Sequence, residues 1–125
     1  MDNAVLVGID IDLGAKVIAA LDAAGVRISV ALWMISPEYD DGRLVIASSR
    51  LDQRHPLRAY EKVAEVLHER FSSSPPAILI LRMKDPFIVN LRSIFGQAAG
   101  VEGMRLGGQQ IGNRFISNAY IYRIT

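Results

Sequence analysis

The sequence contains no cysteine, and its 125 residues include only one tryptophan and two histidines. Without cysteine the chain can form neither disulfides nor thiolate metal sites, and it has no cysteine nucleophile. The longest apolar runs are far shorter than the roughly 20 residues of a membrane-spanning helix. The start, Met1-Asp2-Asn3, shows no basic segment before an apolar run. We therefore expect a cytoplasmic protein with no signal peptide and no membrane partner.

Net charge is also small, at +1, but it is unevenly distributed. Residues 1–41 hold seven acids and two bases, whereas residues 42–125 hold six acids and twelve bases. Such an asymmetry attracts an anionic partner or another copy of the chain, unless folding mixes the two signs.

Half of the residues are hydrophobic and 22% are charged, which is typical of a globular domain. Apolar residues at steps of three and four predict a first helix that ends at Ala24 and starts between Asn3 and Asp12, although residues 4–12 also fit a strand. Residues 28–35 alternate with apolar side chains on both faces, which predicts a central strand. A polar turn over 37–42 and a second strand over 43–50 complete an antiparallel hairpin.

The second half alternates helices and strands. Pro56 and the pair Asp85-Pro86 mark helix starts, because proline presets the first turn and aspartate caps free amides. The remaining elements are a helix with Leu57, Tyr60, Val63, Ala64, Leu67 and Phe71 in register, a buried parallel strand over 78–81, a helix with Phe87, Leu91, Ile94 and Phe95 inside that ends at Gly96, and strands over 104–111 and 115–124. The order α-β-β-α-β-α-β-β predicts one mixed α/β (α+β) domain over residues 1–125, with three helices and a five-stranded mixed sheet.

The segment Gly8-Ile9-Asp10-Ile11-Asp12-Leu13-Gly14 resembles the first strand of ribonuclease H-like nucleases and actin-type ATPases. That resemblance implies a Mg²⁺ site at Asp10 and Asp12, and hence a metal-dependent nuclease or phosphotransferase. The later acids that would complete the site are scattered, at Glu65, Glu69, Asp85 and Glu102. The helical spacing favours the alternative that both aspartates lie in the first turns of a helix.

Other motifs predict little chemistry. The glycines between 100 and 112 lack the order of a phosphate-binding loop, and Ser48-Ser49 lacks the surroundings of a nucleophile elbow. His55 and His68 are too far apart for a helical metal pair, so we expect His55 at a helix entrance and His68 on a solvated face. We expect no bound metal and no cofactor.

A basic set with two tyrosines, Tyr120 and Tyr122, is a candidate nucleic-acid surface. Its members are Arg82, Lys84, Arg92, Arg105, Arg114 and Arg123. The alternative is that the tyrosines cover a core or a dimer interface.

Residues 31–38, residues 43–49 and the tail over 118–123 resemble a family of short bacterial proteins with no assigned function. The hairpin also resembles the sensory GAF-type pattern, but a long helix follows it at once and too few strands remain, so we infer no ligand pocket.

No coherent catalytic set emerges from these motifs. We therefore expect a non-catalytic interaction or regulatory module that self-associates as a homodimer. The final strand, placed at a sheet edge, would pair or pack through Tyr120 and Tyr122.

Overall fold

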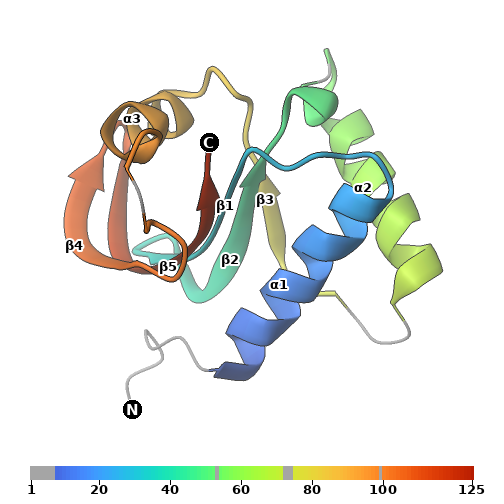
Figure 1. Ribbon diagram of the computed structural model, residues 1–125, viewed down its shortest axis with the longest axis horizontal. Helices are drawn as coiled ribbons and strands as arrows, with labels where there is room; N and C mark the ends of the chain where they lie inside the picture. Colours follow the sequence, from blue (N-terminus) through green and yellow to red (C-terminus); the bar gives the residue numbers. More distant parts are fainter. Residues whose placement is uncertain (1–7, 53, 72–74, 99) are drawn as a thin grey trace.

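The structure, a computed structural model, describes residues 8–52, 54–71, 75–98 and 100–125 (Figure 1). It contains three α-helices, five strands and one short 3₁₀ helix in the expected order. They are α1 (Gly8–Ala23), β1 (Val30–Ser36), β2 (Tyr39–Ala47), η1 (Ser49–Leu51), α2 (Pro56–Arg70), β3 (Ile78–Ile80), α3 (Pro86–Phe95), β4 (Arg105–Ile111) and β5 (Arg114–Ile124). The α/β class, the mixed sheet and the element order are confirmed.

The strands form one sheet in the order β3-β2-β1-β5-β4. β1 pairs antiparallel with both β2 and β5, β4 pairs antiparallel with β5, and β3 runs parallel to β2. The prediction that the final strand lies at an edge is therefore wrong, because β5 sits between β1 and β4. The edges are β4 and the three-residue β3, whose side chains are partly exposed rather than buried.

β1 is central because apolar side chains occupy both of its faces, and all seven of its residues are buried. Ala31, Trp33 and Ile35 pack into one core with α1 and α2. Leu32 and Met34 pack into a second core with α3. The sheet is thus a middle layer, with α1 and α2 on one face and α3 on the other (Figure 1).

The helices bury fewer residues than their spacing predicts. α2 buries Ala59, Val63 and Leu67, and α3 buries Phe87, Ile88 and Leu91. Leu57 is 67% exposed and Ile94 is 56% exposed. Each lies near one end of its helix. None of the helices in the described part of the chain has the length and apolar character needed to cross a lipid bilayer.

α1 confirms the helical alternative for the aspartate segment, because Asp10 and Asp12 both lie in its first turns. The helix ends one residue before the predicted position. Gly25, with φ of +86°, lets the Val26 amide donate to the Leu21 carbonyl at 2.9 Å and close the last turn. The predicted range for the start of this helix included positions before Gly8, but residues 1–7 lie outside the described residues.

The hairpin turn is tighter than predicted. β2 starts at Tyr39, so that only Pro37 and Glu38 separate the strands. A register irregularity between Met34 and Ser36 absorbs the difference, since Met34 pairs with Arg43 whereas Ser36 pairs with Tyr39. The residues that were expected to form a wide polar loop thus extend the second strand.

Tyr120 and Tyr122 pack inside their own chain, on the face that α1 covers. The Tyr122 hydroxyl donates to the Ile11 carbonyl at 2.6 Å, and the two rings meet edge to face with centroids 5.1 Å apart. Gly14 of α1 makes this approach possible, since a Cβ there would lie 2.8 Å from Cζ of Tyr122. Both rings thus contribute to the packing of α1 against the sheet.

We predict that Gly14→Ala destabilises the protein by roughly 1–3 kcal/mol, the usual cost of overpacking a filled site. In an unhindered helix the same change would stabilise by about 1 kcal/mol. In a Tyr122→Leu background, which removes the far ring atoms, Gly14→Ala should become neutral or stabilising. Urea unfolding of the four proteins measures this coupling, and equal effects in both backgrounds would contradict the packing account.

Candidate functional site

The carboxyl ends of the parallel strands β2 and β3 lie at the same edge of the sheet, and the chain leaves each of them toward a helix N-terminus. After β2 it forms η1 and enters α2, and after β3 it enters α3. Ligands of open α/β sheets commonly bind outside the carboxyl ends of the strands. This edge is therefore the first place to look for functional side chains.

Ser48 is fully buried and organises this edge. Its hydroxyl donates to the Arg27 carbonyl and accepts from the Arg50 amide at 3.1 Å. The serine thus ties the loop that enters β1 to the segment that leaves β2, and it is the N-cap residue of η1.

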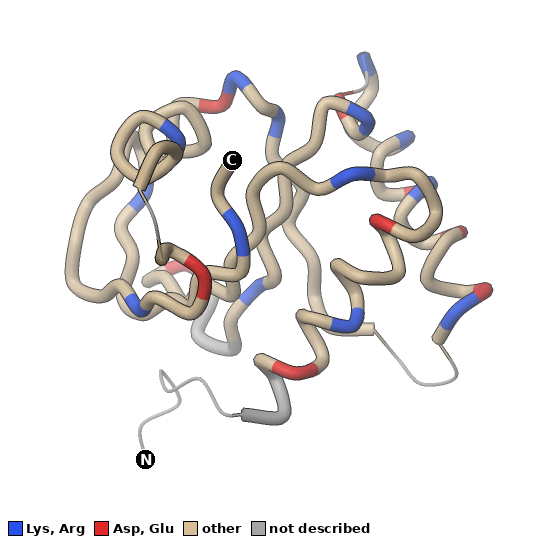
Figure 2. The backbone as a smooth tube through the Cα atoms, in the orientation of Figure 1, with Lys and Arg blue, Asp and Glu red and all other residues tan. Residues whose placement is uncertain are grey.

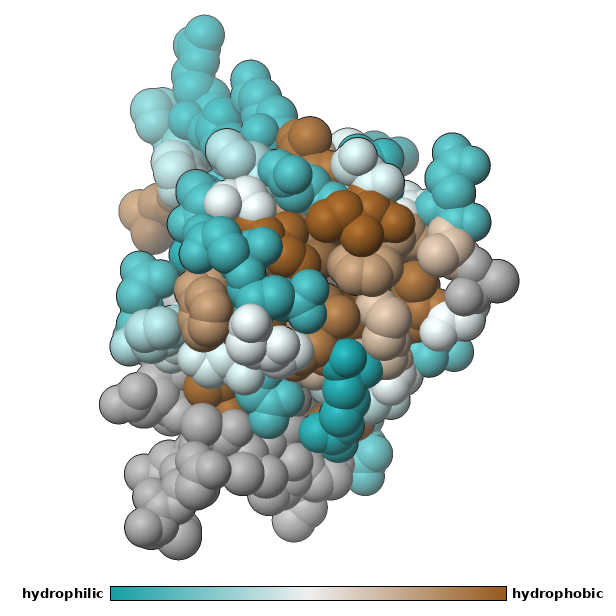
Figure 3. Space-filling model, turned by 90° about the vertical axis from the view of Figure 1, so that its left-hand side faces the viewer, coloured by the Kyte–Doolittle hydropathy of each residue, from teal (hydrophilic) through white to brown (hydrophobic). Residues whose placement is uncertain are grey.

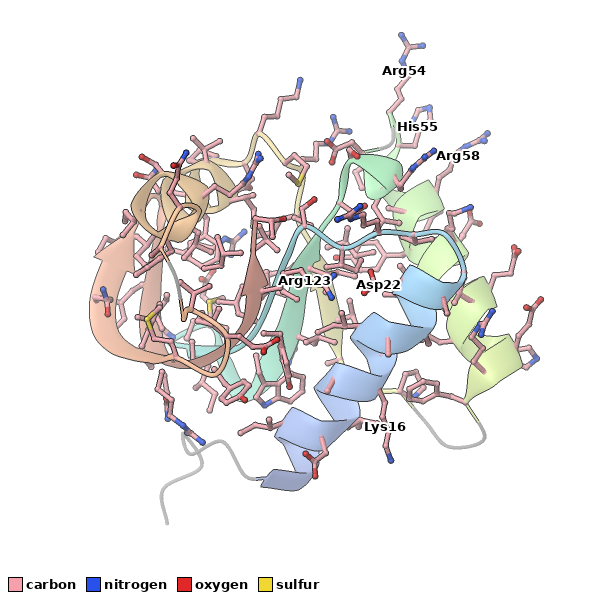
Figure 4. The ribbon with its side chains drawn as sticks, in the orientation of Figure 1. Lys16, Asp22, Arg54, His55, Arg58 and Arg123 are labelled. Atoms are coloured by element: carbon pink, nitrogen blue, oxygen red, sulfur yellow. The ribbon has the colours of Figure 1, made fainter. Side chains whose placement is uncertain are left out.

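Five cationic residues on two segments gather at this edge, and we call them the arginine rim. Arg50 lies on η1, Arg54 lies between η1 and α2, and Arg58 lies in the first turn of α2. Arg82 and Lys84 lie between β3 and α3. All five are exposed. Figure 2 shows Lys and Arg gathered along this upper edge of the molecule, and Figure 4 shows Arg54 and Arg58 pointing outward from it.

Hydrogen bonds hold the two segments of the rim together. Nη2 of Arg82 donates to the Arg54 carbonyl at 3.1 Å, and the Met83 amide donates to the Asp52 carboxylate at 3.1 Å. The other nearby acid, Asp85, accepts from the Phe87 amide at 2.9 Å and caps α3. Both carboxylates thus accept backbone amides. With Glu61, one turn after Arg58 on α2, the nearby acids number three against the five cations of the rim.

His55 is the N-cap residue of α2, as predicted, but its side chain makes no capping hydrogen bond. The 15-residue helix therefore begins among the rim cations without a side-chain cap. The positive end of its dipole adds to their field.

A hollow of about 180 Å³ lies beside the rim. Its walls are mostly apolar, with one arginine and one acid, and comprise Leu51, Pro56, Ala59, Tyr60, Ile80, Leu81, Arg82 and Asp85. The Tyr60 hydroxyl accepts from the Ile80 amide at 3.0 Å. Since the hollow holds one charge of each sign, the excess positive charge lies on the surface around it.

The predicted basic set does not form one surface. Arg82 and Lys84 belong to the rim, whereas the other four serve the fold or lie elsewhere. Arg92 donates to the Thr125 carbonyl at 2.8 Å, and the Arg105 guanidinium lies 5.7 Å from the centre of the Tyr120 ring. Arg114 begins β5, and its Nε is buried with no hydrogen-bond partner among the described residues.

Arg123 forms a clasp with Asp22 at the end of α1, where the two labelled side chains meet in Figure 4. Its two terminal nitrogens lie 2.9 and 3.2 Å from the two carboxylate oxygens, and Nη1 also donates to the Ile28 carbonyl at 2.8 Å. The Ile28 amide donates to the same carboxylate at 3.0 Å. The clasp forms part of the lining of an open cavity of about 440 Å³, together with Arg27.

Burial alone would raise the pKa of the Asp22 carboxyl. Hydrogen bonds from Arg123 and Ile28, with the positive charges of Arg123 and Arg27, outweigh burial and lower the pKa below its ordinary value of 3.8. The carboxylate is therefore ionised at neutral pH, and the clasp joins the last strand of the sheet to the first helix.

The metal hypothesis loses its structural basis. Asp10 and Asp12 lie on a helix instead of at a strand end. Within the described residues, no three His, Asp or Glu side chains are grouped so that they could hold a metal ion. His68 lies exposed on α2, as predicted.

The rim residues that the sequence reasoning missed are Arg50, Arg54 and Arg58. Their spacing of four residues was a visible signal. It was overlooked because only the pairing of β2 with β3 brings that segment beside Arg82 and Lys84.

Neither a protein-family model, nor a curated protein sequence, nor a solved structure matches this chain. The resemblance to short bacterial proteins therefore stays a prediction.

The Asp22 clasp has a pH signature. Because pairing lowers the folded-state pKa below 3.8, its stabilisation is present above about pH 3.8 and is lost as the pH falls through the lower folded value. We predict that Asp22→Asn is less stable than the wild type at pH 7 and that the difference shrinks below pH 4. Urea midpoints measured from pH 7 to pH 2 test this, with Asp12→Asn on the same helix as the control; a difference that does not change with pH would refute it.

Proposed function

We propose that this chain is a non-catalytic interaction module that forms a homodimer through the outer edge of β4. The single observation that carries the proposal is the position of β4. It is a seven-residue strand at the end of the sheet, paired with β5 on one side only. An edge strand presents unpaired backbone donors and acceptors, which makes it suited to pairing with another strand.

A second copy of the chain is the occupant that this edge fits best. β4 carries one charge, Arg105, at its first position. Antiparallel pairing about a two-fold axis centred on Gly108 would place Arg105 of each copy opposite Ile111 of the other. The two arginines would therefore lie at opposite ends of the shared ladder, where they do not repel each other.

An exposed apolar side chain next to the edge supports the same interface. Phe115, which pairs with Gln110 of β4, is 41% exposed. Figure 3 views the molecule from the side that carries β4 and α3, and it shows hydrophobic surface gathered there between hydrophilic regions. Covering such surface in a dimer removes it from water.

This proposal changes the location of the predicted homodimer and retains the oligomeric state. Tyr120 and Tyr122 belong to the chain's own core, so the interface moves from β5 to β4. The cytoplasmic location and bacterial origin remain part of the proposal. The metal-dependent nuclease or phosphotransferase has no observation in its favour and is not proposed.

We predict that light scattering at tens of micromolar protein gives twice the chain mass of 13.8 kDa. Gln109→Lys combined with Gln110→Lys should give a folded monomer at the same concentration. Both positions are exposed, and the register centred on Gly108 would bring the two added charges at position 109 diagonally across the axis on one face of the sheet, with those at position 110 on the other face.

The control adds the same charge at exposed positions of α1 and α2, as Ala19→Lys combined with Ala64→Lys, and should remain dimeric. A wild-type chain that is monomeric at 100 micromolar would overturn the proposal. Equal dissociation of both double variants would show that total charge, and not the β4 edge, controls assembly.

A further inference from the structure

We propose that the arginine rim is a binding surface for the sugar-phosphate backbone of nucleic acid, independent of base sequence. The rim is Arg50, Arg54, Arg58, Arg82 and Lys84, on two segments that hydrogen bonds hold side by side. The inference does not depend on the β4 dimer, since the rim lies at a different edge of the sheet.

The chemistry of the rim fits phosphate groups. Four of its five cations are arginines, whose planar guanidinium presents paired donors to phosphate oxygens. The N-terminus of α2, which begins between Arg54 and Arg58, adds the positive end of a helix dipole. Two of the acids nearby, Asp52 and Asp85, accept backbone amides.

The arrangement of the rim cations favours a polyanion over a single small anion. The cations lie along a rim, and the hollow beside them is small and mostly apolar, with Asp85 in its wall. A free phosphate would therefore find no enclosed site, whereas a backbone with a charge on every nucleotide can contact several rim cations at once. The five rim residues are all cations, which bind phosphate oxygens, so their contacts should position the partner without selecting a sequence.

A membrane surface fits the rim less well. Peripheral membrane binding combines cations with a buried apolar face. Near the rim, α2 exposes two large hydrophobic side chains. Leu57 is 67% exposed, whereas Tyr60 is only 36% exposed. One leucine offers little area to insert between lipids.

Fluorescence anisotropy with a labelled 20-nucleotide strand, alone and annealed to its complement, tests the inference. We expect micromolar binding at 100 mM salt that weakens steeply as salt increases, because each phosphate contact releases counterions. Arg54→Gln combined with Arg58→Gln should weaken binding at least tenfold and reduce the slope of log K against log salt by about 2. Both residues are exposed, so the variant should fold, which circular dichroism checks.

The matched control, Lys16→Gln combined with Arg70→Gln, removes the same charge. Lys16 lies on α1, and Arg70 lies at the other end of α2, about 20 Å from the rim. Its affinity should stay within twofold of the wild type, and Lys84→Gln alone, on the second segment, should weaken binding about threefold.

Each other outcome would overturn the inference. Equal losses in the rim and control variants would mean that only net charge matters. Binding to vesicles with 30% phosphatidylserine but not to oligonucleotide would assign the rim to membranes. Displacement of the strand by poly-glutamate at equal charge concentration would assign it to acidic proteins, and no binding to any probe would leave the rim without a polyanionic partner.

Discussion

The fold depends on the burial of β1 from both sides. Its seven residues are all buried, and each face belongs to a different hydrophobic core. Because every backbone group in such a strand must find a hydrogen-bond partner inside the protein, β1 requires a strand on each side. β2 and β5 are those strands, and the helices of both outer layers pack onto the surface that the three strands form together.

Local sequence signals located most of the elements. Steps of three and four residues found the helices, and Asp85-Pro86 marked the start of α3 as the structure has it. The order of strands in the sheet could not be predicted from local patterns. A period of two indicates which residues of a strand share a face, but it does not indicate which other strand pairs with it. β5 was therefore placed at an edge, although it pairs with β1 some 90 residues earlier in the chain.

The same limit applies to the candidate surfaces. The Asp22–Arg123 clasp joins residues 101 positions apart, and no local pattern indicates it. The role of Ser48 is not visible in the sequence, because its hydroxyl donates to the carbonyl of Arg27, which lies in another loop. Only part of the arginine rim was predicted from the sequence. Arg82 and Lys84 were identified as candidates, but the three arginines on the segment that follows β2 were not, because the parallel pairing of β2 with β3 brings the two segments together. The chemical type of each side chain is known from the sequence, but which side chains lie close together depends on how the strands pair in the tertiary structure.

The interior position of β5 also constrains how the molecule folds. β4 pairs only with β5, and one side of β1 stays open until β5 arrives. The hairpin of β1 and β2 can form early because a short turn connects its strands, but closing β5 onto β1 brings together distant segments and costs loop entropy first. Until that last strand has been synthesised, the apolar edge of β1 is available to other chains. The interval before β5 docks is therefore when this protein is most exposed to aggregation.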